Sequence, residues 1–137
     1  MRLMMILTTM ALLAFPVWAQ DEALPWQLTV TGQIEALRDG EPEIALSFAG
    51  QSFRQVYDDP ERFVADIGRI GYLPIIESQS HRFGEYRQIE PDFVIQVVEL
   101  LDAERVGWEA LYQLRNEPDE GWRVHGVLLR RIPGLNI

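Results

Sequence analysis

Three apolar runs separated by short polar breaks constrain the fold of this chain more than any other feature. The runs cover residues 93–101, 108–115 and 122–130, and each break is only about six residues long. Parallel strands need a crossover of about a dozen residues or more, whereas antiparallel strands can be joined by such short turns. The sequence therefore predicts a three-stranded antiparallel meander.

The spacing of apolar residues within these runs indicates which face of the sheet is buried. The middle run has the period of two typical of a half-buried strand, with the apolar set Trp108, Ala110, Tyr112 and Leu114. The third run is predicted to place Trp122, Val124 and Leu128 on one face and Arg123, His125 and Arg131 on the other. An apolar sheet face of this size must be covered by another layer.

The residues before the strands have helical spacing. From Pro25 onward, apolar residues recur at intervals of three or four as far as Leu37, and Gly40 can end this helix. A second helix is predicted to start near Pro42 and to be interrupted by Gly50. A further helical turn follows around Phe53.

The third helix carries the clearest start signal. Asp59 is placed to cap it, Pro60 occupies the first helical position, and Gly71 can end it. Its predicted buried stripe is Phe63, Ile67 and Ile70. The segment 72–76 is expected to be extended, because a residue before proline avoids helical geometry, and residues 83–89 form a candidate fourth strand.

Helices followed by strands define an α+β fold, with three helices over one face of a curved antiparallel sheet. Residues 20–137 are predicted to form this single domain.

The N-terminus has the pattern of a secretory signal peptide. A positive start at Arg2 precedes an apolar run over residues 3–15, and Val17 and Ala19 are small residues at the positions that a signal peptidase reads. The alternatives are a membrane anchor or a buried first helix, but about 13 apolar residues are too few to span roughly 30 Å of hydrocarbon. We expect cleavage between Ala19 and Gln20 and export to the periplasm, or alternatively to the extracellular space.

Composition argues against several classes of function. The formal net charge is -9, without a cluster of Lys or Arg, so binding to nucleic acid or to an anionic membrane surface is not expected. Cysteine is absent, which excludes disulfides and thiolate metal ligands. His81 and His125 lack carboxylates at helical spacing, so no metal site and no cofactor are predicted.

Several segments together resemble a known superfamily. They are 45–53, 63–70 followed by Tyr72-Leu73-Pro74, 108–114, and Gly121-Trp122-Arg123-Val124-His125-Gly126. With the order of elements, they resemble the nuclear transport factor 2-like superfamily, the α+β cone of ketosteroid isomerase-like and SnoaL-like proteins. More narrowly, the chain resembles the bacterial family called domain of unknown function 4864. The resemblance implies a conical cavity between helices and sheet, which relatives use for catalysis or for ligands, or simply fill.

The resemblance to ketosteroid isomerase-like proteins implies a carboxylate base opposite a tyrosine. Asp66, three residues after Phe63, is the carboxylate that best fits this role, and Tyr57, Tyr72 or Tyr112 could donate to an oxyanion. The alternative is that Asp66 faces solvent and the tyrosines are core rings.

Candidate ligand-binding residues are aromatic. Tyr72, Trp108, Tyr112 and Trp122 could line an apolar pocket, joined by Phe93, or could instead fill the core. Arg123, Arg130 and Arg131 form a basic edge that could hold an anion, pair with a second subunit, or be solvated.

Three hypotheses about function follow. The first is a non-enzymatic exported domain that binds a small apolar ligand or a protein partner in its cavity. The second is a small isomerase or dehydratase that uses Asp66 and a tyrosine. The third is a structural subunit that forms a homodimer through its sheet.

Overall fold

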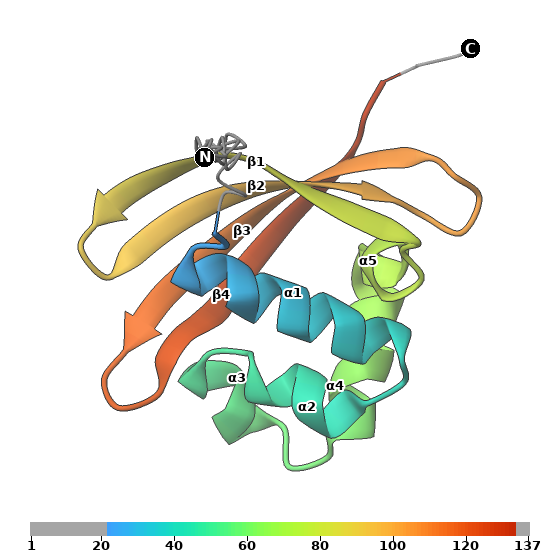
Figure 1. Ribbon diagram of the computed structural model, residues 1–137. Coiled ribbons are helices and arrows are strands. Elements are labelled where there is room, and N and C mark those ends of the chain that lie inside the picture. Colours follow the sequence, from blue (N-terminus) through green and yellow to red (C-terminus); the bar gives the residue numbers. More distant parts are fainter. Residues whose placement is uncertain (1–21, 134–137) are drawn as a thin grey trace, which may run out of the picture.

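The computed structural model describes residues 22–133 (Figure 1). The predicted signal peptide and its cleavage site lie outside these residues. The described chain begins with helices and ends with strands. The helical elements are α1 (Pro25–Arg38), α2 (Pro42–Ser47), α3 (Gln51–Val56), α4 (Pro60–Ile67), the π-helical turn η1 (Gly68–Tyr72) and α5 (Leu73–Ile76). The strands are β1 (Ser80–Glu90), β2 (Phe93–Leu101), β3 (Gly107–Glu117) and β4 (Gly121–Arg131).

The strands form one antiparallel sheet in the order β1-β2-β3-β4, so each strand pairs with its neighbour in the sequence. Figure 1 shows the helices gathered against one face of this twisted sheet. The predicted α+β class, with N-terminal helices packed on an antiparallel sheet, is confirmed. The fourth strand predicted at 83–89 is also present, as β1.

The core lies between α1 and the inner face of the sheet, which is the face that the helices cover. The predicted stripe of α1 is buried at Trp26, Val30, Ile34 and Leu37. In β3 the alternation is confirmed, because Ala110, Tyr112 and Leu114 are buried while their neighbours are only half-buried. These two buried faces share one hydrophobic cluster.

Helix α4 begins as predicted, because the Asp59 carboxylate accepts a hydrogen bond from the Glu61 amide at 3.0 Å. Phe63 is buried, but the prediction that Ile70 is buried is wrong, since its side chain is 72% exposed. The chain passes from α4 into the π-helical turn η1 after Ile67. A π turn is wider than an α turn, so the residues that follow leave the predicted stripe.

The prediction that residues 72–76 are extended is also wrong. Leu73–Ile76 forms the short helix α5, and Leu73 has helical angles although a proline follows it. Pro74 lies in the first turn of α5, where a missing amide proton costs no helical hydrogen bond. Gly71, inside η1, interrupts the helical path shortly before α5, with φ 120° and ψ 6°.

A β-bulge changes which residues of β4 face the core. Gln113 pairs with Gly126, but Leu114 pairs with Val124, so His125 is an extra residue in β4. The bulge reverses the alternation beyond it. Leu128 therefore points away from the core and is 62% exposed, which contradicts the prediction that it shares a face with Val124. Val127 and Leu129 pack against the core instead.

Candidate functional site

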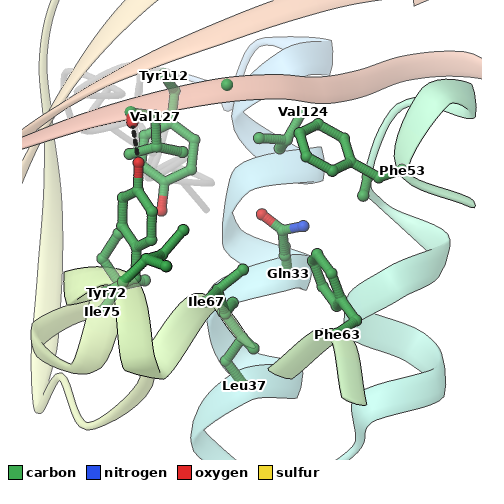
Figure 2. A pocket seen from close by; sticks show the side chains of 13 residues that line it. Gln33, Leu37, Phe53, Phe63, Ile67, Tyr72, Ile75, Tyr112, Val124 and Val127 are labelled. Carbon is green, nitrogen blue, oxygen red and sulfur yellow. Dashed lines mark hydrogen bonds between the residues drawn. The ribbon is translucent and has the colours of Figure 1, made fainter. Parts of the chain in front are cut away.

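An apolar cavity of about 310 Å³ lies between the helices and the inner face of the sheet. Figure 2 shows side chains from both layers directed towards it. Its lining residues come from five helical elements, two strands and the segment before α3, and none of them is charged. They are Gln33, Leu37, Ala49, Phe53, Phe63, Ile67, Ile70, Tyr72, Ile75, Tyr112, Val124, Gly126 and Val127.

Two attachments to the backbone of β4 hold the walls of the cavity together. Ala49 forms a parallel bridge to Val124, in which the Val124 amide donates to Phe48 at 2.9 Å and the Gly50 amide donates to Val124 at 2.8 Å. On the other side, the Tyr72 hydroxyl donates to the Val127 carbonyl, which ties η1 to β4 (Figure 2). Ile70 is exposed, so its side chain lies at the rim of the cavity, whereas the buried residues Phe63 and Ile75 form deeper parts of the wall.

Gln33 and Tyr112 are buried side chains that bring polar atoms to this apolar lining. The Gln33 amide nitrogen donates to the Ala45 carbonyl at 3.1 Å, which fixes the orientation of the amide. Burial raises the pKa of the Tyr112 hydroxyl well above its ordinary value of 10.0. The nearby charge of Arg38 opposes this rise only in part. The Tyr112 hydroxyl is therefore protonated at any physiological pH.

Of the four predicted ligand-binding aromatics, Tyr72 and Tyr112 line the cavity, whereas Trp108 and Trp122 lie outside it. The Trp108 indole N–H donates to the Asp102 carboxylate at 2.9 Å, which holds the ring at the β2–β3 turn. Trp122 packs edge-on against Trp26, with ring centroids 5.4 Å apart. Both tryptophans pack against the core cluster.

The other residues singled out from the sequence lie on the outer face or at the ends of the sheet. Phe93 lies under the Arg115 guanidinium, 4.3 Å from its ring centre, and does not reach the cavity. Arg130 pairs with Glu109 at 2.7 Å, and Arg123 lies 3.8 Å from Glu120. Two of the three arginines of the predicted basic edge are thus neutralised by neighbouring carboxylates.

Asp66 lies outside the apolar cavity. It lines a separate surface hollow with Tyr57, Arg62 and other residues around the start of α4. Its carboxylate accepts a hydrogen bond from the Tyr57 hydroxyl at 2.9 Å and pairs with Arg69. The same hydrogen bond raises the pKa of Tyr57. The structure therefore brings Asp66 to Tyr57 but not to Tyr72 or Tyr112.

The two histidines lie in different surroundings. His81 accepts a hydrogen bond at Nδ1 from Arg38 at 2.9 Å, so its Nε2 carries the proton and donates to Thr31 at 3.1 Å. Burial, and then the charge of Arg38, lower the pKa of His81. His125 lies 2.8 Å from Glu117. Within residues 22–133, no three His, Asp or Glu side chains are placed to hold a metal ion.

An ionic cluster attaches α3 to the β3–β4 hairpin, next to the cavity. Glu117 accepts hydrogen bonds from the Gln51 amide at 2.9 Å and from Arg54 at 2.8 Å, in addition to its contact with His125. Arg54 also reaches Glu120 at 3.3 Å. Because α3 carries Phe53, this cluster fixes one wall of the cavity.

Sequence reasoning missed Gln33, Phe53, Phe63 and Ile67 as cavity residues. Gln33 had a usable signal, since it is a polar residue seven positions after Trp26 on the buried face of α1. Phe53, Phe63 and Ile67 had none that separates them from ordinary core residues. Their place on the cavity wall depends on how α3 and α4 pack.

The fold and the site define an α+β domain with an apolar cavity between its two layers. The chain matches the model of the family described as domain of unknown function (DUF4864) over residues 19–137, and it belongs to that family. No curated protein matches the chain. Across residues 22–133, none of the helices is both long enough and apolar enough to cross a membrane.

Proposed function

We propose that this protein is a non-enzymatic binding domain that takes up a small apolar molecule in the cavity between its helices and its sheet. The observation that carries the proposal is the composition of the cavity wall, whose 13 lining residues include no charged side chain. The volume of about 310 Å³ is at the lower end of the range for small-molecule sites. Such a wall favours apolar ligands because burial removes their surface from water.

The position of Asp66 supports binding over catalysis. An isomerase that used the cavity would need a base inside it. Asp66 lines a separate surface hollow, and its carboxylate is occupied by Tyr57 and Arg69. Asp66→Asn is therefore expected to leave ligand binding unchanged.

The proposal is tested with naphthalene as a fluorescent apolar probe and the full-length chain. We expect saturable binding at one site, accompanied by a rise in the unfolding temperature. Ile67→Trp, which adds a large ring to the cavity wall, is expected to abolish binding. Leu128→Trp, on the outer face, adds the same ring away from the cavity and is the matched control. Absence of saturable binding, or equal binding by both variants, contradicts the proposal.

We propose a relation to the nuclear transport factor 2-like superfamily, supported by the order of helices and sheet around a cavity. We also propose export by cleavage after Ala19, supported by the positive start at Arg2 and the apolar run over residues 3–15. N-terminal sequencing of protein recovered from the periplasm of an expressing bacterium tests the cleavage, with Gln20 as the expected first residue.

Self-association through the outer face of the sheet is a second candidate function. Val97, Leu111 and Leu128 pair across β2, β3 and β4 and form an apolar row on that face. Two salt bridges flank this row: Arg82 pairs with Glu99, and Arg130 pairs with Glu109. Light scattering at micromolar concentration tests this candidate. A dimer that Leu128→Arg converts to a monomer supports it, and a strict monomer contradicts it.

A further inference from the structure

The Tyr112 hydroxyl is a buried polar group that the fold leaves free. Tyr112 is only 1% exposed and lines the cavity, and Figure 2 shows its ring extending from β3 towards the helices beside Tyr72. The Tyr72 hydroxyl is occupied by the Val127 carbonyl. Within residues 22–133, the hydroxyl of Tyr112, which borders the cavity, has no hydrogen-bond partner. Its O–H is therefore available to a ligand that enters the cavity.

The side-chain oxygen of Gln33 is a second free polar atom on the same cavity wall. Because the amide nitrogen is fixed on Ala45, Oε1 is the atom left to face other partners. Gln33 is buried and lines the cavity, and no hydrogen bond to its Oε1 occurs in the described part of the chain. The cavity thus combines one free O–H donor with one free acceptor.

Building on the proposed function, we propose that the cavity selects small uncharged molecules that carry a hydroxyl group. Tyr112 donates to the ligand oxygen, and Gln33 Oε1 is the acceptor available to the ligand O–H. The remaining lining residues provide the apolar surroundings for the rest of the molecule.

Charge is the property that the cavity excludes. An ionised carboxylate or amine in this site would lose its hydration without meeting an opposite charge on the wall. Arg38, the cation whose charge reaches Tyr112, is not a lining residue. Its guanidinium is engaged by Ser78 at 2.9 Å and by His81 at 2.9 Å.

The test uses three probes with one aromatic body, which are 2-naphthol, 2-methylnaphthalene and 2-naphthoate. Their dissociation constants are measured by fluorescence at pH 7 with the full-length chain and with Tyr112→Phe. We expect Tyr112→Phe to weaken the binding of 2-naphthol, relative to that of 2-methylnaphthalene, by about threefold to tenfold. This is the range for one net hydrogen bond. 2-Naphthoate is expected to bind at least about tenfold more weakly than 2-naphthol.

Tyr72→Phe is the matched control, since it removes a hydroxyl from the same cavity that is already occupied by a protein carbonyl. This variant is expected to be less stable, but the ratio of the dissociation constants of the two neutral probes should stay unchanged. If Tyr112→Phe does not change the ratio of the dissociation constants of 2-naphthol and 2-methylnaphthalene, Tyr112 does not donate to the ligand oxygen. The proposed binding of naphthalene would still stand. Equal binding of 2-naphthoate overturns the exclusion of charge. Failure of every probe to bind overturns both this inference and the proposed function.

A measurement on the unsubstituted protein covers the case in which Tyr112→Phe does not fold. The chemical shift of the Tyr112 ring carbon that bears the hydroxyl reports hydrogen bonding at that group. We expect it to move on addition of 2-naphthol much more than on addition of 2-methylnaphthalene. Equal shifts with both probes overturn the inference.

Discussion

Glu117 near the end of β3 lies 2.8 Å from His125, the extra residue of the β4 bulge. The bulge thus places an imidazole against the carboxylate that also holds the N-terminus of α3 through the Gln51 amide. A single carboxylate therefore links the irregularity in the sheet to a wall of the cavity.

This arrangement predicts a loss of stability in acid. Burial alone would raise the pKa of Glu117, but hydrogen bonds from Gln51 and His125 and the charges of His125 and Arg54 outweigh it and lower the pKa below 4.5. The folded chain therefore takes up this proton at lower pH than the unfolded chain. The contribution of Glu117 to the free energy of unfolding is present above about pH 4.5 and is lost as pH falls through the lowered pKa.

Urea unfolding between pH 3 and pH 7 tests this prediction. Glu117→Gln is expected to lower the free energy of unfolding by about 1–3 kcal/mol at pH 7 and to flatten its decline in acid. Glu43→Gln, at an exposed position in α2, is the control and should follow the original curve. A variant at Glu117 that retains the full acid dependence would show that other groups cause it.

The turn between β2 and β3 depends on Asp102. Its carboxylate accepts hydrogen bonds from the Glu104 amide at 2.9 Å, the Val106 amide at 2.8 Å and the Trp108 indole at 2.9 Å. Asp102→Ala is expected to cost about 3 kcal/mol, because it leaves these donors without their acceptor. Urea unfolding measures the loss, with exposed Glu104→Ala as the control. Equal stability of the two variants would contradict this role.

The bulge in β4 predicts opposite responses at two neighbouring leucines. Leu129→Ser is expected to cost about 2 kcal/mol, because Leu129 packs against the core. Leu128→Ser is expected to change stability by less than about 0.5 kcal/mol, because Leu128 points outward. Urea unfolding measures both variants, at a protein concentration low enough that further dilution no longer changes the free energy of unfolding. The reverse order of the two variants would mean that β4 lacks the bulge.

The turn η1 contains two glycines with different backbone angles. Gly71 has φ 120°, so Gly71→Ala is expected to destabilise the protein by about 1–2 kcal/mol although nothing lies within 4 Å of the added methyl group. Gly68 has helical angles, and a methyl group there meets Ile76 and Leu73 at 3.5 Å. Gly68→Ala should therefore be neutral or stabilising by up to about 1 kcal/mol. Thermal unfolding compares the two variants, and equal effects would contradict the difference in backbone angles between Gly68 and Gly71.

Much of the fold could be predicted because local rules and tertiary packing agree there. The alternation in β3 and the stripe of α1 identified buried faces, since those residues face one continuous core. Asp59 and Pro60 marked the start of α4 because capping involves only neighbouring residues. Positions where local and global preferences agree can be predicted from the sequence.

The errors occur where a local rule was overridden by packing. The pre-proline rule failed at Leu73, where the helical turn buries Ile75 against the core. Periodicity failed at Leu128 because the bulge depends on how β4 pairs with β3, and at Ile70 because α4 widens into a π turn. Half of the predicted binding aromatics reach the cavity, and the two tryptophans pack elsewhere.

The sequence by itself determined the order and type of the main elements and the face of β3 that is buried. These follow from contacts between residues near in the chain and from the period of apolar side chains. Only the tertiary structure decided that Gln33, Tyr72 and Tyr112 surround one uncharged space and that Asp66 lies outside it. A cavity exists where side chains from distant segments fail to fill the gap between layers, and no local pattern records that gap.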